Sequence, residues 1–338
     1  MTPQRKQQNR RCAIPSLAGV ASIALAGMSC AANAQQKGPV YPDRPVRMLV
    51  GFAPGGGADT AARPVAQRLS EVLGQQFVVD NRPGAGGNIA TEIAARATPD
   101  GYSLLVGTIA ALAINPSIYE KLAFDPIRDF SPITNMASSI NVLVVHPSVA
   151  AKTVKELVAL ARTRPGQLNF ATSGVGGPPH LAGVAFAQVT GLKWAFIPYK
   201  GGAAALIDVA GGHADLTFNG MLATYPYVKS GRLRLVAVSG SKRYPTLPEV
   251  PTVSESGVPG FETGSWQGIL AASASPRAAL ERLSTDIARI LNVAEMREYL
   301  GRQGAEVSTM KPEQLSAWMK TEVAKWAEVV RKGGIKLE

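Results

Sequence analysis

Gly51-Phe52-Ala53-Pro54-Gly55-Gly56-Gly57-Ala58-Asp59 is the stretch that decides the fold, because it separates two segments with different apolar patterns. The apolar run Val46–Val50 precedes it, and small apolar residues recur every three to four positions after it, from Ala58 to Leu73. A short apolar run is typical of a buried strand, and the longer period is typical of a helix with one buried face. The sequence therefore predicts a strand, a glycine loop and a helix.

The glycine loop is a candidate anion site. At the start of a helix the backbone N–H groups lack partners and lie at the positive end of the helix dipole. Glycines also let an anion approach the backbone closely. Asp59 falls in the first helical turn, where we expect its carboxylate to shape the loop and not to touch the anion. The alternative is a tight turn that needs small residues and binds nothing, and the loop alone is compatible with both.

The same arrangement occurs again in the second half of the chain. The run Leu168–Ala171 leads into the glycine-rich residues 172–177, and a helix is predicted to begin near Pro178. Strand and helix patterns alternate around both loops, which favours α/β layers with largely parallel sheets. Two such modules predict two lobes facing each other across a cleft. We expect the passages between the lobes at the irregular stretch of about 130–142 and at the proline-rich residues 245–260.

Residues 1–34 have the pattern of an export signal. An apolar stretch runs from about Cys12 to Met28, and Ala32-Asn33-Ala34 fits the small-x-small cleavage rule. The basic start contains Arg5, Lys6, Arg10 and Arg11 and no acidic residue. The alternatives are a membrane anchor, for which the apolar run is short, and a lipidated Cys30, which lacks the aliphatic residue expected before it. We therefore predict a periplasmic protein cleaved near Ala34.

Composition narrows the class of the exported chain. Cleavage would remove both cysteines, so the remaining chain of about 300 residues would need a core that is stable without disulfides, and this length suffices for two domains. The net charge of +11 would fall by four to +7. The basic residues are scattered and no run of them alternates with aromatic residues, which argues against a nucleic-acid partner. A mildly basic surface favours anionic solutes.

Motifs for several common chemistries are absent from the sequence. There is no GxxxxGK[ST] phosphate loop, the glycine loops do not fit GxGxxG, and no GxSxG surrounds Ser173. The histidines, His146, His180 and His213, lack metal-ligand spacing, so we predict no metal and no cofactor. His180, at the start of a helix behind a glycine loop, either donates to a ligand or makes a structural hydrogen bond. An exported hydrolase using Ser173 and His180 is the alternative function, and a structural or adhesion protein is the third.

Several segments of the chain are shared, in the same order, with a known family. They are Tyr41-Pro42-Asp43-Arg44-Pro45-Val46-Arg47, Pro54-Gly55-Gly56-Gly57-Ala58-Asp59, Asn81-Arg82-Pro83-Gly84-Ala85-Gly86-Gly87, Pro99-Asp100-Gly101-Tyr102, Thr172-Ser173-Gly174 with His180-Leu181, Pro198-Tyr199-Lys200-Gly201-Gly202, Gly231-Arg232-Leu233-Arg234 and Leu247-Pro248-Glu249-Val250-Pro251-Thr252. Through them, essentially the whole chain after the signal resembles the periplasmic solute receptors of tripartite tricarboxylate transporters, also called Bug or TctC-type receptors.

The resemblance implies a two-lobed periplasmic-binding-protein fold of the Venus flytrap kind, type II-like, with a ligand cleft between α/β lobes. Lobe 1 would comprise residues 35–140 plus 246–338, and lobe 2 residues 141–245. The implied function is that of a receptor, not an enzyme, which captures a small mono- or dicarboxylic acid for integral-membrane transporter subunits. The receptor is expected to be a monomer.

The resemblance also implies which loops hold the ligand carboxylates, through backbone N–H groups and water. Many relatives carry an acidic residue where Asn219 stands, so its replacement favours a ligand without an amine. The residues Gly177-Pro178-Pro179 also depart from the usual sequence before the histidine. The matching ligand-binding positions are Phe52, Pro54, Gly55, Gly56, Gly57, Asp59, Thr108, Ser173, Gly174, Gly176, His180, Tyr199, Gly201, Gly202 and Asn219.

The first prediction concerns processing. Because Ala32-Asn33-Ala34 fits the cleavage rule, the exported protein is expected to begin at Gln35 or close to it. Intact-mass measurement of the protein recovered from the periplasm tests this. An unprocessed chain, or a diacylglycerol on Cys30, would contradict it.

Overall fold

The structure, a computed structural model, describes residues 41–335 with the exception of 175, 200, 246 and 303. The chain from Tyr41 onward forms one compact unit. The predicted export signal therefore lies outside the described residues.

Strands and helices alternate along most of the described chain. The strands are β1(Val46–Val50), β2(Phe77–Asn81), β3(Ser103–Thr108), β4(Phe130–Val145), β5(Asn169–Thr172), β6(Ala195–Pro198), β7(Leu216–Gly220), β8(Arg234–Val238), β9(Gly264–Ala272) and β10(Glu306–Val307). The helices are α1(Gly57–Leu73), α2(Asn88–Ala95), α3(Asn115–Ile118), α4(Val154–Thr163), α5(Pro178–Thr190), α6(Gly202–Ala210), α7(Met221–Lys229), α8(Arg277–Leu291), α9(Ala294–Arg302) and α10(Pro312–Gly333), with short turns η1(Ala85–Gly87) and η2(Ala110–Ile114).

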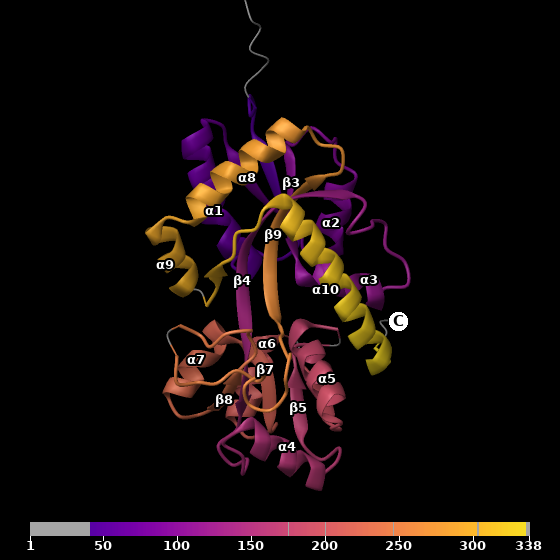
Figure 1. The fold of residues 1–338 in the computed structure, drawn as a ribbon, viewed down its shortest axis with the longest axis vertical. Coiled ribbons are helices and arrows are strands. Elements are labelled where there is room, and N and C mark those ends of the chain that lie inside the picture. The colour runs from indigo at the N-terminus through magenta and orange to yellow at the C-terminus, as the bar shows by residue number, and fades with distance from the viewer. Residues whose placement is uncertain (1–40, 175, 200, 246, 303, 336–338) are drawn as a thin grey trace, which may run out of the picture. The chain divides into compact units, whose positions relative to one another are not determined.

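Strand β1, which the apolar run before the first glycine loop predicts, lies inside the first sheet. Strands β2 and β3 pair with it on either side, both parallel, with Met48 aligned with Val79 and with Leu104. Strand β9 then runs antiparallel between β3 and β4. The first sheet therefore has the order β2-β1-β3-β9-β4, with β10 added to β4 (Figure 1).

Strand β4 belongs to two sheets. Its residues 130–140 pair with β9, whereas residues 141–145 pair with β7 on one side and β8 on the other. Strands β7, β5 and β6 run parallel to one another and antiparallel to this end of β4. The second sheet therefore has the order β4-β7-β5-β6, with β8 beside β4.

The directions of the strands determine which of their ends meet. Strands β1, β2 and β3 run in the same direction as β4. Gln267 of β9 pairs with Thr108 at the end of β3 on one side and with Ala137 of β4 on the other, so β3 ends level with Ala137. Strand β7 runs against β4 and ends at Gly220, opposite Asn141. The carboxyl ends of both parallel groups thus face each other along the intervening residues of β4. Open α/β sheets bind their ligands outside the carboxyl ends of the strands.

Apolar cores lie on both faces of each sheet. On the first sheet, α1, α8 and α9 contribute to one core, and α2, α3 and α10 contribute to the core on the opposite face. On the second sheet, α4 and α5 contribute to one core, and α6 and α7 contribute to the other. Helix α1 buries the predicted face from Ala58 to Leu69, and Leu73 packs against the same core, but Val72 is half exposed.

Helix α10 is a second connection between the two sheets. Leu315 and Met319 of α10 share a core with Leu181 and Val184 of α5. The Gln188 Nε2 of α5 donates to the Val329 carbonyl of α10 at 2.9 Å. Figure 1 shows α10 running from β9 toward α5, and the two helices are in contact.

One of the two predicted passages has a different structure. Residues 130–142 form most of β4, so the expectation of irregular structure is wrong, although β4 does pass from one sheet to the other within this stretch. Pro132 fits because the pairing register with β9 shifts beside it. The proline-rich passage lies against the second sheet. Thr252 forms a β-bridge with Val238 of β8, and Phe261 is part of the apolar core to which α4 and α5 contribute. The lobe boundaries stay a prediction, and this packing favours assigning residues 246–261 to the second lobe.

The second prediction concerns the close approach of the paired strands β4 and β9. A Cβ on Gly264 would lie 2.5 Å from the backbone oxygen of Ser139, which cannot move like a flexible side chain. Gly264→Ala is expected to lower the free energy of unfolding by about 1–3 kcal/mol. Gly268→Ala in the same strand is the matched control, because its Cβ would make only ordinary contacts at 3.6 Å. Urea unfolding compares them, and equal midpoints would refute the close approach.

Candidate functional site

The first glycine loop is held by the Asp59 side chain, which is 1% exposed. Its Oδ2 accepts from the Gly55 N–H at 2.9 Å, and both carboxylate oxygens accept from Arg63 at 2.8 Å. Asn81 at the end of β2 donates to Asp59 Oδ1 and to the Phe52 carbonyl, both at 2.9 Å. Asp59 therefore fixes the loop, as the sequence analysis expects.

These contacts also neutralise the Asp59 charge. Burial of the carboxyl favours its protonated form, but the hydrogen bonds from Arg63, Gly55 and Asn81 outweigh burial and lower the pKa of Asp59 below its usual value. The carboxylate stays ionised near neutral pH and is paired with the Arg63 guanidinium. An anion at the loop would thus meet a neutral ion pair and not an isolated negative charge.

The loop after β2 lies against the loop after β1. A Cβ on Gly51 would come within 2.7 Å of the Gly87 Cα, and a Cβ on Gly87 would lie 3.3 Å from the Phe52 ring. Asn115 Nδ2 donates to Asn88 Oδ1 at 2.7 Å and to the Gly86 carbonyl at 3.2 Å. Asn88 and Asn115 lie outside the motifs that predict the ligand-binding positions. Only Asn88 could have been found from the sequence, because it directly follows the glycine-rich residues 84–87.

Thr108 lies where β3 ends, at the same edge as the two loops. It is buried, and its Oγ1 accepts from the Ala111 N–H at 3.5 Å, at the start of η2. This contact gives Thr108 a role in starting the turn. The predicted residues Phe52, Pro54, Gly55, Gly56, Gly57, Asp59 and Thr108 thus lie at the carboxyl edge of the first sheet.

The second glycine loop, after β5, lies at the facing edge. The Gly176 N–H donates to His180 Nδ1 at 3.1 Å, so the neutral ring carries its proton on Nε2. The ring packs edge-to-face against Phe196 with centroids 5.0 Å apart, and burial lowers the pKa of His180. His180 therefore makes a structural hydrogen bond with one nitrogen and keeps a donor on the other.

The alternative hydrolase needs Ser173 and His180 to interact directly. Among the described residues no hydrogen bond joins them, and His180 Nδ1 is occupied by the Gly176 N–H. A Cβ on Gly177 would instead come within 2.6 Å of the Ser173 Oγ. The geometry gives no support to a serine nucleophile activated by this histidine.

The remaining predicted residues follow β6 and β7. A Cβ on Gly174 would lie 3.6 Å from the Tyr199 carbonyl, so these two loops are neighbours. Burial and the adjacent Asp208 carboxylate raise the pKa of Tyr199 to about 12, which keeps its hydroxyl protonated. Asn219 Nδ2 donates to the Gly202 carbonyl at 2.9 Å, and its Oδ1 accepts from the Gly220 N–H at 2.8 Å. Gly201 precedes the first turn of α6.

Five helices begin at the facing edges without a side-chain cap: α1, α2, α5, α6 and α7. Away from these edges, α4 is capped by Thr153, whose side chain accepts from the Glu156 N–H. Helix α8 also lacks a cap, so the feature alone does not define a site. Helix α5 differs from the others because Pro178 and Pro179 carry no N–H in its first turn.

The two edges also meet at points that no sequence motif marks. A Cβ on Gly176 would lie 2.9 Å from Ile118 of α3, which places the second loop beside the first sheet. A cavity of about 160 Å³ beside the first loop is lined by Gly55, Gly57, Thr60, Ser139 and Gln267, among others. Ser139 and Gln267 come from β4 and β9, and neither stands in a sequence motif.

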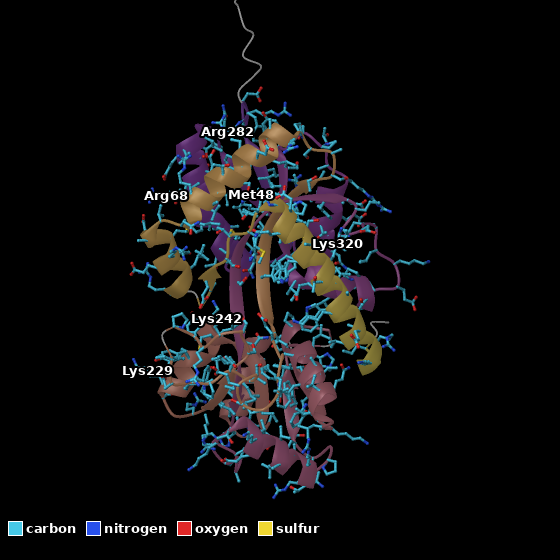
Figure 2. All side chains as sticks on the ribbon, in the orientation of Figure 1. Met48, Arg68, Lys229, Lys242, Arg282 and Lys320 are labelled. Carbon is cyan, nitrogen blue, oxygen red and sulfur yellow. The ribbon has the colours of Figure 1, made fainter. Side chains whose placement is uncertain are left out.

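The basic residues that Figure 2 labels are dispersed over the described chain. Arg68 lies in α1, Lys229 in α7, Lys242 in the segment between β8 and β9, Arg282 in α8 and Lys320 in α10. In the described part of the chain, no group of three or more His, Cys, Asp or Glu residues is arranged to hold a metal ion. Nor does any helix there combine the length and apolar character needed to cross a membrane.

Comparison with known proteins identifies the family. Residues 61–335 match the profile of the Tripartite tricarboxylate transporter family receptor. The chain belongs to this family. Protein BugT of Bordetella pertussis (strain Tohama I) is 34% identical to this receptor over 317 residues, which cover 94% of this chain and 96% of BugT.

Solved structures support the fold of the receptor. The Rpa4515 protein of R. palustris, solved with adipate, is 37% identical and superposes with a TM-score of 0.77, covering 88% of this chain and 100% of that one. MatC from Rhodopseudomonas palustris, solved with bound malate, is 28% identical with a TM-score of 0.72, covering 86% and 100%. The predicted two-lobed α/β fold of periplasmic solute-binding proteins is thus confirmed.

The third prediction tests the Asp59 network. Because the pKa of Asp59 is lowered in the folded state, its carboxylate stabilises the fold above the unfolded pKa of about 4, and this contribution is lost as the pH falls through the folded pKa. Asp59→Asn is expected to lower the free energy of unfolding at pH 7 by about 1–2 kcal/mol, since Arg63 is half exposed.

Urea unfolding of both proteins from pH 7 to pH 2.5 provides the measurement, and the gap between them should narrow below about pH 4. Glu281→Gln, in the exposed pair with Arg277, is the matched control and should leave stability unchanged. A gap that stays constant down to the lowest pH would show that the Asp59 charge is not responsible.

Proposed function

We propose that this receptor binds a small mono- or dicarboxylate between the loop Phe52–Asp59 and the loop at residues 173–176. Its function would be to deliver that acid to the membrane subunits of a tripartite tricarboxylate transporter. The observation that carries the proposal is the meeting of two strand edges at which five helices begin without side-chain caps. Such ends favour anions through free N–H groups and the helix dipole.

On the first side, the start of α1 offers the clearest anion position. Gly56 precedes the helix, so the N–H groups of Gly57, Ala58 and Asp59 have no acceptor within it. Gly57 is exposed, and a Cβ there would meet nothing within 4 Å. A carboxylate therefore has open access to the backbone at this point.

On the second side, the donors are distributed over two elements. The first turn of α6, from Gly202, offers N–H groups without acceptors in the helix. His180 Nε2 adds a neutral donor, because Nδ1 accepts from Gly176. Each charge-assisted hydrogen bond contributes about 1.5–3 kcal/mol. A few of them from both sides reach roughly 8 kcal/mol, which corresponds to micromolar affinity.

Two considerations support the ligand class. Adipate and malate, which occupy two similar proteins, are both dicarboxylates. The described loops hold no free carboxylate that would pair with an amine, because Asp59 is paired with Arg63 and Asn219 is uncharged. We therefore favour a dicarboxylate without an amino group over an amino acid.

The remaining aspects of the function are proposals of the same kind. The receptor would be exported to the periplasm, act as a monomer and carry no catalytic residue. Its two lobes would close on the ligand by bending where β4 and the segment before β9 connect the sheets. Without a ligand the facing donors would be hydrated.

The fourth prediction tests the ligand and its position. Calorimetric titration with malate, adipate and related diacids is expected to find a binder of micromolar affinity, with little binding of the corresponding amino acids or neutral sugars. Gly57→Val is expected to reduce affinity at least tenfold, because the side chain would occupy the open space at the α1 N-terminus. Gly57 is preferable to Gly56, whose Cβ would lie 3.2 Å from the Ala53 carbonyl.

Gly301→Val is the matched control, since Gly301 is also a helical glycine with open space around its Cβ and lies in α9. Its affinity for the diacid should equal that of the parent. Normal diacid binding by Gly57→Val would refute the assigned position, and exclusive binding of sugars or cations by the parent would refute the function.

A further inference from the structure

The cavity beside the first glycine loop offers the proposed ligand a second kind of contact. We call it the loop cavity; its volume is about 160 Å³, and Gly55 and Gly57 line it where the backbone at the start of α1 is open. Leu300 of α9 and Ala305 supply apolar surface, and Gln267 of β9 supplies an amide. None of the described residues that line the loop cavity is charged. A charged group placed there would therefore lose hydration without gaining a counter-charge.

Gln267 is a polar residue on an otherwise apolar face of β9. Ile269 and Ala271 belong to the core to which α1, α8 and α9 contribute, whereas Trp266 and Leu270 belong to the core on the opposite face. Side chains alternate between the two faces of a strand. Gln267 therefore points to the same side as Ile269, toward α1, and lines the loop cavity where the apolar core ends.

The Gln267 amide keeps an acceptor available to a molecule in the loop cavity. Its Nε2 donates to the Ser265 Oγ at 3.3 Å, and its Oε1 accepts from none of the described residues. Gln267 is 8% exposed, but this oxygen is not fully buried, so a molecule in the loop cavity can reach it. Thr60 Oγ1 donates to the Gly55 carbonyl at 3.4 Å and keeps lone pairs of its own. The polar wall of the loop cavity therefore needs a donor.

We propose that the loop cavity holds a hydroxyl group of the ligand, so that the receptor selects a hydroxylated dicarboxylate and Gln267 is its specificity-determining residue. This inference rests on the proposed function, because the carboxylate at α1 places the hydroxyl-bearing carbon beside Gly57. Of the two acids found in similar proteins, malate carries a hydroxyl group and adipate does not. The Gln267 amide favours the first kind of acid.

Other uncharged and charged groups fit the loop cavity less well. A hydroxyl group both donates and accepts, so it pairs with the Gln267 amide whichever amide atom faces it. A keto oxygen only accepts and would leave the Gln267 Oε1 unpaired, and an ammonium group would find no carboxylate on the wall. Cavities of about 150 Å³ accommodate a six-carbon ring. The loop cavity therefore has room for the hydroxyl group together with the carbons next to it.

Sets of acids that differ in one group test this assignment directly. Calorimetric titration compares malate with succinate, and 2-hydroxyglutarate with glutarate and with 2-oxoglutarate. In each set the hydroxy acid is expected to bind about tenfold more tightly than its analogues. The reason is that an analogue without the hydroxyl group leaves the Gln267 amide unpaired when it displaces water from the loop cavity.

Gln267→Met keeps the approximate size of the side chain and removes the amide. It is expected to weaken malate binding about tenfold and to leave succinate binding within about twofold of the parent, so the preference disappears. Gln167→Met is the matched control, because Gln167 lies at an exposed position between α4 and β5, outside the loop cavity. It should keep the preference of the parent. If Gln267→Met does not fold, the acid sets measured on the parent decide the question.

Two kinds of result would overturn the assignment while leaving the proposed function intact, because a diacid still binds. One is a parent protein that binds the unsubstituted or the oxo acid as tightly as the hydroxy acid. The other is a folded Gln267→Met variant with an unchanged preference. If no diacid binds the parent, the proposed function fails and this assignment fails with it.

Discussion

The hydrogen-bond register of β4 is the constraint on which the rest of the structure depends. One strand pairs with β9 over residues 130–140 and with β7 and β8 over residues 141–145. Because β7 runs against β4 whereas β1, β2 and β3 run with it, the carboxyl ends of the two parallel groups are directed toward each other. Had β7 paired in the parallel sense, the second set of loops would lie at the far end of its sheet.

Close backbone approaches occur at two places near these edges. Gly51 lies against Gly87, and Gly264 lies against the Ser139 carbonyl. A side chain at Gly51 would separate the two loops, and a side chain at Gly264 would separate the paired strands β4 and β9. The Asp59–Arg63–Asn81 network performs the complementary task, since it ties the first loop to the end of β2 and leaves the backbone at the start of α1 exposed. Rigidity thus comes from side chains that face inward, and access comes from glycines.

Elements that depend on local sequence patterns could be predicted well, whereas contacts between residues far apart in the sequence could not. Strand, glycine loop and α1 could be predicted because their apolar periods differ within a few residues, and the role of Asp59 followed from its place in the first helical turn. The strand character of 130–142 was missed because Pro132 is a strand breaker by composition, and only the register shift beside it makes room. Three residues at the candidate site, Ser139, Gln267 and Asn115, are marked by no motif. Ser139 and Gln267 come there through the pairing of β4 with β9, which joins residues more than a hundred positions apart, and Asn115 through packing against Asn88. The resemblance to a receptor family supplied the residues after β6 and β7 that periodicity alone would not have selected.

The two sides of the proposed site are chemically unequal, and the reason lies in Pro178 and Pro179. A helix beginning with two prolines loses two of the free N–H groups that its first turn would otherwise offer. The Gly176 N–H is also used, because it donates to His180 Nδ1. That bond fixes the tautomer, so the donor lost from the backbone is replaced by His180 Nε2, which stays neutral because burial lowers the pKa of the ring. The α1 side would therefore supply the dipole and most backbone donors, whereas the α5 side would supply a single, oriented, uncharged donor. An acid with one carboxylate at α1 and a second group near His180 and α6 fits this asymmetry better than a symmetric clamp would.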